Sequence, residues 1–66
     1  MKAIFRVINR SDNMLQQYRN PTDIAIFLWG RRIDNYMIIK SDDKGDRLIA
    51  LESGNINTIK HQLSIA

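Results

Sequence analysis

Lys60 and His61 are the adjacent pair in this chain best suited to contact a nucleic acid. The cationic Lys60 attracts phosphate, and the His61 imidazole can hydrogen-bond a phosphate or the edge of a base. Single-stranded RNA suits such groups because its splayed bases leave their edges free. From spacing alone, the simpler interpretation of His61 is a surface or subunit-interface residue without a ligand. The pair therefore needs support from the rest of the chain.

The other reactive residue types do not form a catalytic or metal site in the sequence. Asp42, Asp43 and Asp46 share one polar turn, but they lack the distant Glu and the full set of oxygen ligands of an EF-hand loop. There is no cysteine, which excludes disulfides and a Cys/His zinc site, and no motif makes Ser64 a nucleophile. We expect no enzyme activity, no metal, no cofactor and no small-molecule substrate.

Length and charge favour one small domain with a charged partner. A fold of 66 residues often depends on oligomerisation when disulfides and metals are excluded. Ten Lys and Arg residues against seven Asp and Glu residues give a net charge of +3, which suits a phosphate-bearing partner. The apolar runs are too short to span a bilayer, and the first residues lack the apolar core of a signal peptide. The expected location is the cytoplasm, without membrane contact.

The elements that must position Lys60 and His61 begin with a predicted helix over residues 9–20. Ser11 or Asp12 can cap this helix, and its apolar stripe consists of Met14, Leu15 and Tyr18. Residues 23–29 favour a buried strand, because most of them are β-branched or aromatic. The alternative is a second helix, capped by residues 20–23 and ending at Gly30.

The second half of the chain alternates as strands do. Residues 33–40 and 47–52 predict a hairpin across a polar turn. After Gly54, residues 56–60 and 62–65 predict two short strands, with a terminal helix as the alternative. A helix followed by about five short strands is typical of a small barrel.

Several motifs, taken in order from Asn9 to the C-terminus, resemble the Sm-like (LSm) family, and within it the Hfq-like RNA chaperones. The similar segments are Asp12–Arg19, Ile26–Leu28 with Gly30, Arg32-Ile33, Leu48–Ser53 and Lys60-His61-Gln62-Leu63-Ser64. The resemblance implies a mainly β, Sm-like domain over residues 1–66, with a short N-terminal helix before a five-stranded, strongly bent antiparallel open barrel. Residues 1–8 would be an N-terminal extension that could form an extra strand.

The resemblance also implies a homo-oligomeric ring, most simply a hexamer, with RNA bound on two faces. The proximal face around the pore would carry Lys60, His61, Ser11, Ser41 and Asp42. The distal face would carry Phe27, Leu28, Gly30, Arg31, Arg32 and Ile33, and the rim would carry Arg19. On the distal face a base could stack on Phe27, although Phe27 and Leu28 are equally well explained as core residues. Arg31 and Arg32 could clamp phosphates, but a basic pair is also common on a solvated turn.

Departures from the family pattern limit the details of base recognition. Ser41 removes the aromatic platform that the family places before Asp42, Asn35 replaces a glycine, and Gln62 is larger than the usual alanine. The expected function is that of an RNA chaperone binding U-rich or A-rich single-stranded RNA. The alternative is a small interaction or inhibitor protein, for example of phage or mobile-element origin, that adds a strand or helix to a host protein. The apolar segment 3–8 supports this alternative.

Overall fold

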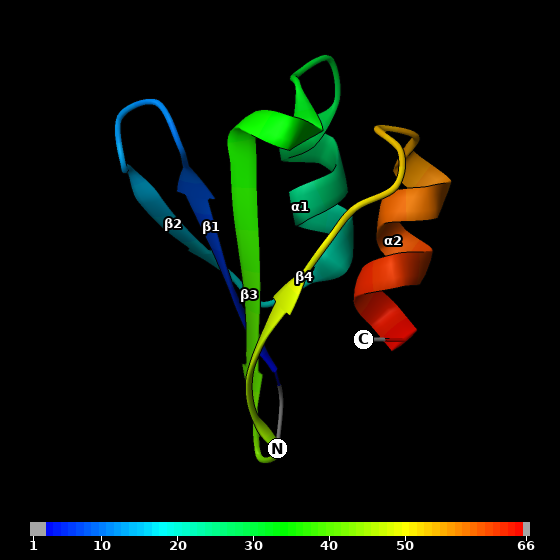
Figure 1. Ribbon diagram of the computed structural model, residues 1–66. Coiled ribbons are helices and arrows are strands. Elements are labelled where there is room, and N and C mark those ends of the chain that lie inside the picture. Colours follow the sequence, from blue (N-terminus) through cyan, green and yellow to red (C-terminus); the bar gives the residue numbers. More distant parts are fainter. Residues whose placement is uncertain (1–2, 66) are drawn as a thin grey trace.

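The computed structural model describes residues 3–65, a mainly β arrangement of one four-stranded antiparallel sheet and two α-helices (Figure 1). The elements are β1 (Ile4–Asn9), β2 (Leu15–Tyr18), α1 (Pro21–Leu28), the 3-10 turn η1 (Ile33–Asn35), β3 (Tyr36–Asp42), β4 (Gly45–Ile49) and α2 (Ile56–Ile65). The strand order is β2-β1-β3-β4. Neither helix within these residues is long and apolar enough to cross a membrane.

The element order repeats itself, because each half of the chain consists of a hairpin followed by a helix. The two hairpins are β1–β2 and β3–β4, and both are antiparallel. The central pair β1–β3 joins the halves, from Ile4 opposite Ser41 to Asn9 opposite Tyr36. The sheet is therefore symmetric in strand order about its centre.

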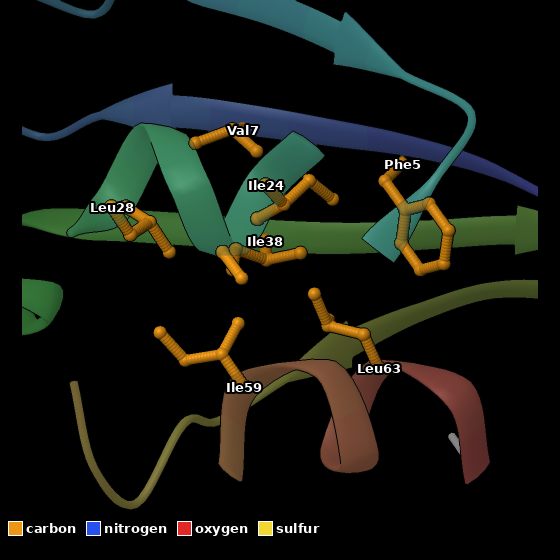
Figure 2. Close-up of a cluster of buried hydrophobic side chains, with 8 residues drawn as sticks. Phe5, Val7, Ile24, Leu28, Ile38, Ile59 and Leu63 are labelled. Atoms are coloured by element: carbon orange, nitrogen blue, oxygen red, sulfur yellow. The ribbon is translucent and has the colours of Figure 1, made fainter. Parts of the chain in front are cut away.

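The core lies between one face of the sheet and the two helices (Figure 2). Its buried residues are Phe5 and Val7 of β1, Ile38 of β3, Ile24, Ala25 and Leu28 of α1, and Ile59 and Leu63 of α2. In Figure 2, Ile59 and Leu63 extend from α2 toward the sheet and α1. Each of the larger apolar side chains contributes about 1.5–3 kcal/mol when fully buried, so this core holds the helices against the sheet.

The prediction of a helix over residues 9–20 is wrong, because these residues complete a hairpin. The Asn9 side chain accepts a hydrogen bond from the Ser11 N–H at 2.8 Å, and the Asp12 side chain accepts one from the Met14 N–H at 3.0 Å. Such local bonds compete with helix formation. Asn13 has φ of 59°, a left-handed conformation that Asn tolerates better than most residues. The supposed apolar stripe is divided, since Leu15 and Tyr18 lie on opposite faces of β2.

The prediction of a strand over residues 23–29 is also wrong, and the helical alternative is confirmed. Asn20 is the N-cap of α1, with its side chain accepting from the Thr22 N–H at 2.9 Å, and Pro21 occupies the first turn. Ile24, Ala25 and Leu28 form one buried stripe, so the helical period rather than β propensity describes this segment.

The two C-terminal strands predicted at 56–60 and 62–65 are likewise wrong, since α2 occupies these residues. Asn55 caps the helix by accepting from the Asn57 N–H at 2.9 Å. Ile59 and Leu63, four residues apart, face the core. Within residues 3–65 there are thus four strands and no N-terminal helix, and the five-stranded Sm-like barrel is not seen.

The hairpin prediction is confirmed with shifted bounds. Residues 33–40 and 47–52 were expected to form a hairpin, and the observed strands are β3 and β4, joined at Asp43 and Lys44. Strand β1 overlaps the segment expected as an N-terminal extension, and its Phe5 and Val7 face the core. Residues 1 and 2 of the predicted extension lie outside the described residues.

Candidate nucleic-acid interface

Lys60 and His61 lie on α2, not on strands around a pore. His61 is exposed and Lys60 is half-buried. Leu63 of the same motif is a core residue, and the Ser64 hydroxyl donates to the Lys60 carbonyl oxygen at 2.7 Å within the helix. Gln62 accepts a hydrogen bond from the Glu52 N–H at 3.0 Å, which ties α2 to the preceding loop. This motif therefore has structural roles in α2, with His61 left on the surface.

Ser41, Asp42 and Arg19 lie near the end of the sheet that carries the β3–β4 turn. The Asp42 carboxylate forms an ion pair with Arg47 at 2.6 Å and accepts from the Lys44 N–H at 2.9 Å. Ser41 accepts a hydrogen bond from the Arg6 guanidinium at 2.7 Å. Arg19 is exposed just after β2. These residues belong to the hairpin and sheet surface, and they do not meet Lys60 and His61 in one site.

Phe27 packs inside an aromatic cluster on the helix side of the sheet. Its ring centroid lies 5.9 Å from that of Tyr18 and 5.5 Å from that of Tyr36, the latter in an edge-to-face arrangement. Leu28 is fully buried, and Ile33 packs against the core. The core interpretation of Phe27 and Leu28 fits these contacts.

Three predicted residues do come together, at the opposite end of the sheet from the β3–β4 turn. Ser11, Arg31 and Arg32 line an open cleft with a volume of about 480 Å³. Its other lining residues are Asp34, Asn35 and Tyr36. The β1–β2 turn supplies Ser11, and the loop between α1 and η1 supplies the two arginines, so segments far apart in the sequence line this cleft. Both segments lie at the same end of the molecule (Figure 1).

The loop after α1 is shaped by its glycine and by Arg31. Gly30 has φ of 77°, a conformation that L side chains rarely adopt, and it lets the chain turn away from the helix end. The Arg31 N–H donates to the Leu28 carbonyl oxygen at 2.9 Å, and its side-chain Nε donates to the Phe27 carbonyl oxygen at 2.8 Å. The Arg31 guanidinium carbon lies 4.6 Å from the Phe27 ring centroid. Arg31 is therefore ordered before any ligand arrives.

A polar network fixes the opposite wall of the cleft. The Ser11 hydroxyl donates to the Asn35 side-chain oxygen at 2.9 Å, and the Asn35 amide donates to the Asn9 side-chain oxygen at 3.1 Å. The Arg10 N–H donates to the Asn35 carbonyl oxygen at 2.8 Å. Asn35 thus connects the β1–β2 turn to η1.

Charge in the cleft is positive, with two arginines against the single carboxylate of Asp34. The positive field reaches the aromatic cluster behind Arg31. Burial raises the pKa of the Tyr18 phenol, while Arg31 opposes that rise and Asp23 and Tyr36 add to it. The net result is a Tyr18 that stays neutral to higher pH than an exposed tyrosine.

Trp29 is the residue whose importance the sequence interpretation missed. It is the single tryptophan of the chain, it lies beside Gly30 and Arg31, and its side chain is 71% exposed. Assigning residues 23–29 to a buried strand hid this exposure. The helix signal at Asn20-Pro21 would have placed Trp29 at a helix end, next to two arginines, where an aromatic is available to a ligand.

Among residues 3–65, no group of three or more His, Cys, Asp or Glu side chains is placed to hold a metal ion. The candidate site is therefore the cleft of Ser11, Arg31, Arg32 and their neighbours. Trp29 is exposed and lies two residues before Arg31 in the sequence. Comparison of the chain with protein-family models, curated proteins and solved structures finds no match.

Proposed function

We propose that this protein binds single-stranded RNA at the cleft between the β1–β2 turn and the loop after α1. The observation that carries the proposal is an exposed tryptophan beside two arginines. Trp29 is 71% exposed, and Arg31 and Arg32 follow it after one glycine. Single strands bind to surfaces that combine stacking platforms with positive charge.

Each residue has a distinct role in the proposal. A base stacks on Trp29, while Arg32, an exposed side chain, contacts a phosphate. Arg31 adds charge from a position already fixed by its bonds to the Phe27 carbonyl and ring. Ser11 and Asn35 offer hydroxyl and amide groups to a base edge. Asp34 repels phosphate, so the backbone of the RNA runs on the arginine side of the cleft.

The proposal changes the site that the Sm-like resemblance implies while keeping the ligand class. Lys60 contributes general positive charge from α2. The proposed activity is RNA binding without a catalytic step, and the proposed location is the cytoplasm. A ring closed by strand pairing stays a prediction of the resemblance, but the residues that it would use form α2.

Tryptophan fluorescence tests the stacking step directly, because Trp29 is the sole tryptophan. Titration with unstructured uridine-rich and adenine-rich 12-mers at low salt should quench and shift its emission. Stacking is worth about 1–3 kcal/mol per base, so Trp29→Ala should weaken binding by roughly 5- to 150-fold, as measured by anisotropy of labelled RNA. Trp29→Phe should retain most of the affinity.

Arg32→Ala tests the phosphate contact, and Lys44→Ala is its matched control. Lys44 is exposed in the β3–β4 turn, at the other end of the sheet, and its loss removes the same charge. One phosphate contact to a single strand contributes about 0.7 to the slope of log affinity against log salt concentration. Arg32→Ala should lower the slope by that amount and Lys44→Ala by less. Equal effects of the two variants would contradict a localised site.

A second candidate function is interaction with another protein by strand addition. The edge strands β2 and β4 each pair with only one strand in the described sheet, and such edges are templates for pairing. The RNA titrations separate the two candidates. Absence of binding to either oligonucleotide at low salt would favour the protein partner.

A further inference from the structure

The sheet face opposite the helices, here called the open face, is apolar. Strand alternation and register place ten residues on it, in three rows that run across the paired strands. The first row is Leu15, Ile8 and Met37, and the second is Gln17, Arg6, Ile39 and Leu48. A third row at the sheet end is Ile4, Ser41 and Asp46. Six of these ten side chains are aliphatic or Met.

Such a face departs from that of a solvated antiparallel sheet. When one face of an antiparallel sheet packs on a core, the other usually alternates to polar residues. Here the side chains of Leu48 and Leu15 are 65% and 49% exposed, and the smallest dimension of the molecule is 17 Å, the thickness of one sheet and one helix layer. Within residues 3–65, no third layer covers the open face (Figure 1).

We infer that a second copy of this chain covers the open face, in a two-fold symmetric dimer with sheet packed on sheet. The face carries aliphatic side chains rather than aromatic ones, so it suits interdigitation with another sheet and not base stacking. A two-fold axis parallel to the strands, between β1 and β3, places β2 of one copy over β4 of the other. Sheets packed in this way keep their strand directions within about 30° of each other.

Charges at one end of the open face fit this symmetry. Asp46 lies on edge strand β4, in the row of Ile4 and Ser41. Arg19 is exposed and directly follows Tyr18, the last residue of β2, so it lies at this same end of the sheet on the opposite edge. The proposed axis therefore sets Arg19 of each copy over Asp46 of the other, which gives two equivalent ion pairs at the rim.

Arg6 is the charged residue nearest the middle of the open face. The position of its guanidinium limits the desolvation cost of dimer formation. Its guanidinium donates to the Ser41 hydroxyl at 2.7 Å. The side chain thus leans toward the row that contains Asp46, at the rim of the face. A cation held there keeps its access to water.

The size of the open face sets the expected affinity of the dimer. Four strands spaced about 4.8 Å apart and rows spanning about 20 Å give close to 400 Å² of flat area per copy. Interfaces this small are at the low end for specific complexes. We therefore expect a dimer that dissociates in the micromolar range. The inference is independent of RNA binding, because the cleft lies at the end of the sheet and not on its open face.

Sedimentation velocity of the full chain from 1 to 300 µM tests the dimer. We expect a monomer–dimer equilibrium, with Leu48→Lys weakening association at least about tenfold, because it puts a charge in place of an exposed apolar side chain of the open face. Ile26→Lys is the matched control. Ile26 is 60% exposed on α1, in the other layer, so this variant gains the same charge without affecting the dimer. Circular dichroism establishes that both variants fold.

The charge pair supplies a second, independent readout. Asp46→Arg and Arg19→Asp should each weaken the dimer, and the double variant should recover it. A monomer at every concentration would overturn the inference, as would a mass six times that of the chain. It would also be overturned by a dimer that Ile26→Lys weakens as much as Leu48→Lys does, or by a double variant no tighter than the single ones.

Discussion

Leu63 and His61 show how two neighbouring positions of one motif acquire different roles in a helix. Leu63 is fully buried between α2, α1 and the sheet, whereas His61, two residues earlier, is exposed. In a strand, residues two apart would share a face; in a helix they do not. The motif that suggested a binding strand is therefore part of a helix with a core face and a solvent face.

Alanine substitution at these two positions should separate the roles. Leu63→Ala leaves a cavity in the core and should lower the free energy of unfolding by about 2–5 kcal/mol. His61→Ala should change it by no more than about 0.5 kcal/mol, as exposed substitutions do. Urea denaturation followed by circular dichroism measures both. A large loss for His61→Ala would contradict its placement on the helix surface.

Tyr18 gives the fold a dependence on alkaline pH. Burial raises the pKa of its phenol above the ordinary 10.0, so the folded state holds the proton more tightly than the unfolded state does. This contribution to stability is fully present below pH 10 and is lost as pH rises through the folded pKa. We expect the stability of the wild type to fall more steeply above pH 10 than that of Tyr18→Phe, in urea titrations at pH 8 to 11. Parallel curves would exclude Tyr18 as the source.

At the scale of the elements, both helices begin at an asparagine that precedes the helix and accepts hydrogen bonds from its first turn. Asn20 accepts from the Thr22 N–H at 2.9 Å, and Asn55 accepts from the Asn57 N–H at 2.9 Å. These caps satisfy backbone donors that the helix itself leaves unpaired. They mark where each helix begins and add to the packing of α1 against α2 that stabilises both helices.

Asn55→Ala should therefore lower the free energy of unfolding by about 1 kcal/mol, the usual loss for an N-cap. Asn55→Asp should keep most of the stability, because its carboxylate accepts the same bonds. Thermal and urea denaturation compare the two variants with wild type. A loss of equal size in Asn55→Asp would show that the cap is not the cause.

How well the sequence predicted the elements depended on whether local or tertiary forces decided each segment. The hairpin of β3 and β4 follows from alternation and was predicted, whereas residues 1–8 were assigned only to an N-terminal extension that could form a strand. Residues 23–29 have isoleucines that favour strands, but the stripe of Ile24, Ala25 and Leu28 meets α2, and this packing outweighs β propensity. Residues 9–20 were misassigned because Asn9 and Asp12 support turns as readily as helix caps.

The candidate site was predicted only in part, because tertiary structure decides which of its residues meet. The sequence predicted Ser11 on one face of a ring and Arg31 and Arg32 on the other. In the structure all three line the same cleft. Trp29 and Tyr36 were not predicted as site residues. The exposure of Trp29 depends on the turn at Gly30, and the position of Tyr36 depends on the sheet register. Lys60 and His61 were assigned to a site that requires strands, and α2 places them elsewhere.

For the whole molecule, self-association should appear as a concentration-dependent stability. A dimer of folded chains shifts unfolding by mass action, so the midpoint of thermal unfolding should rise between 5 and 300 µM chain. Leu48→Lys should remove this rise, while Ile26→Lys should keep it. Differential scanning calorimetry provides the measurement. A midpoint that is constant over this range in wild type would contradict a native dimer.

The symmetric strand order has a consequence for the order in which the chain folds. The two hairpins are local and can form in about 1–10 μs, but the central pair β1–β3 must join residues as far apart as Ile4 and Ser41. The slow event is therefore the meeting of two preformed halves along one seam. Destabilising that seam with Val7→Ala should slow folding, whereas truncating the edge residue Leu48 should change the folding rate little.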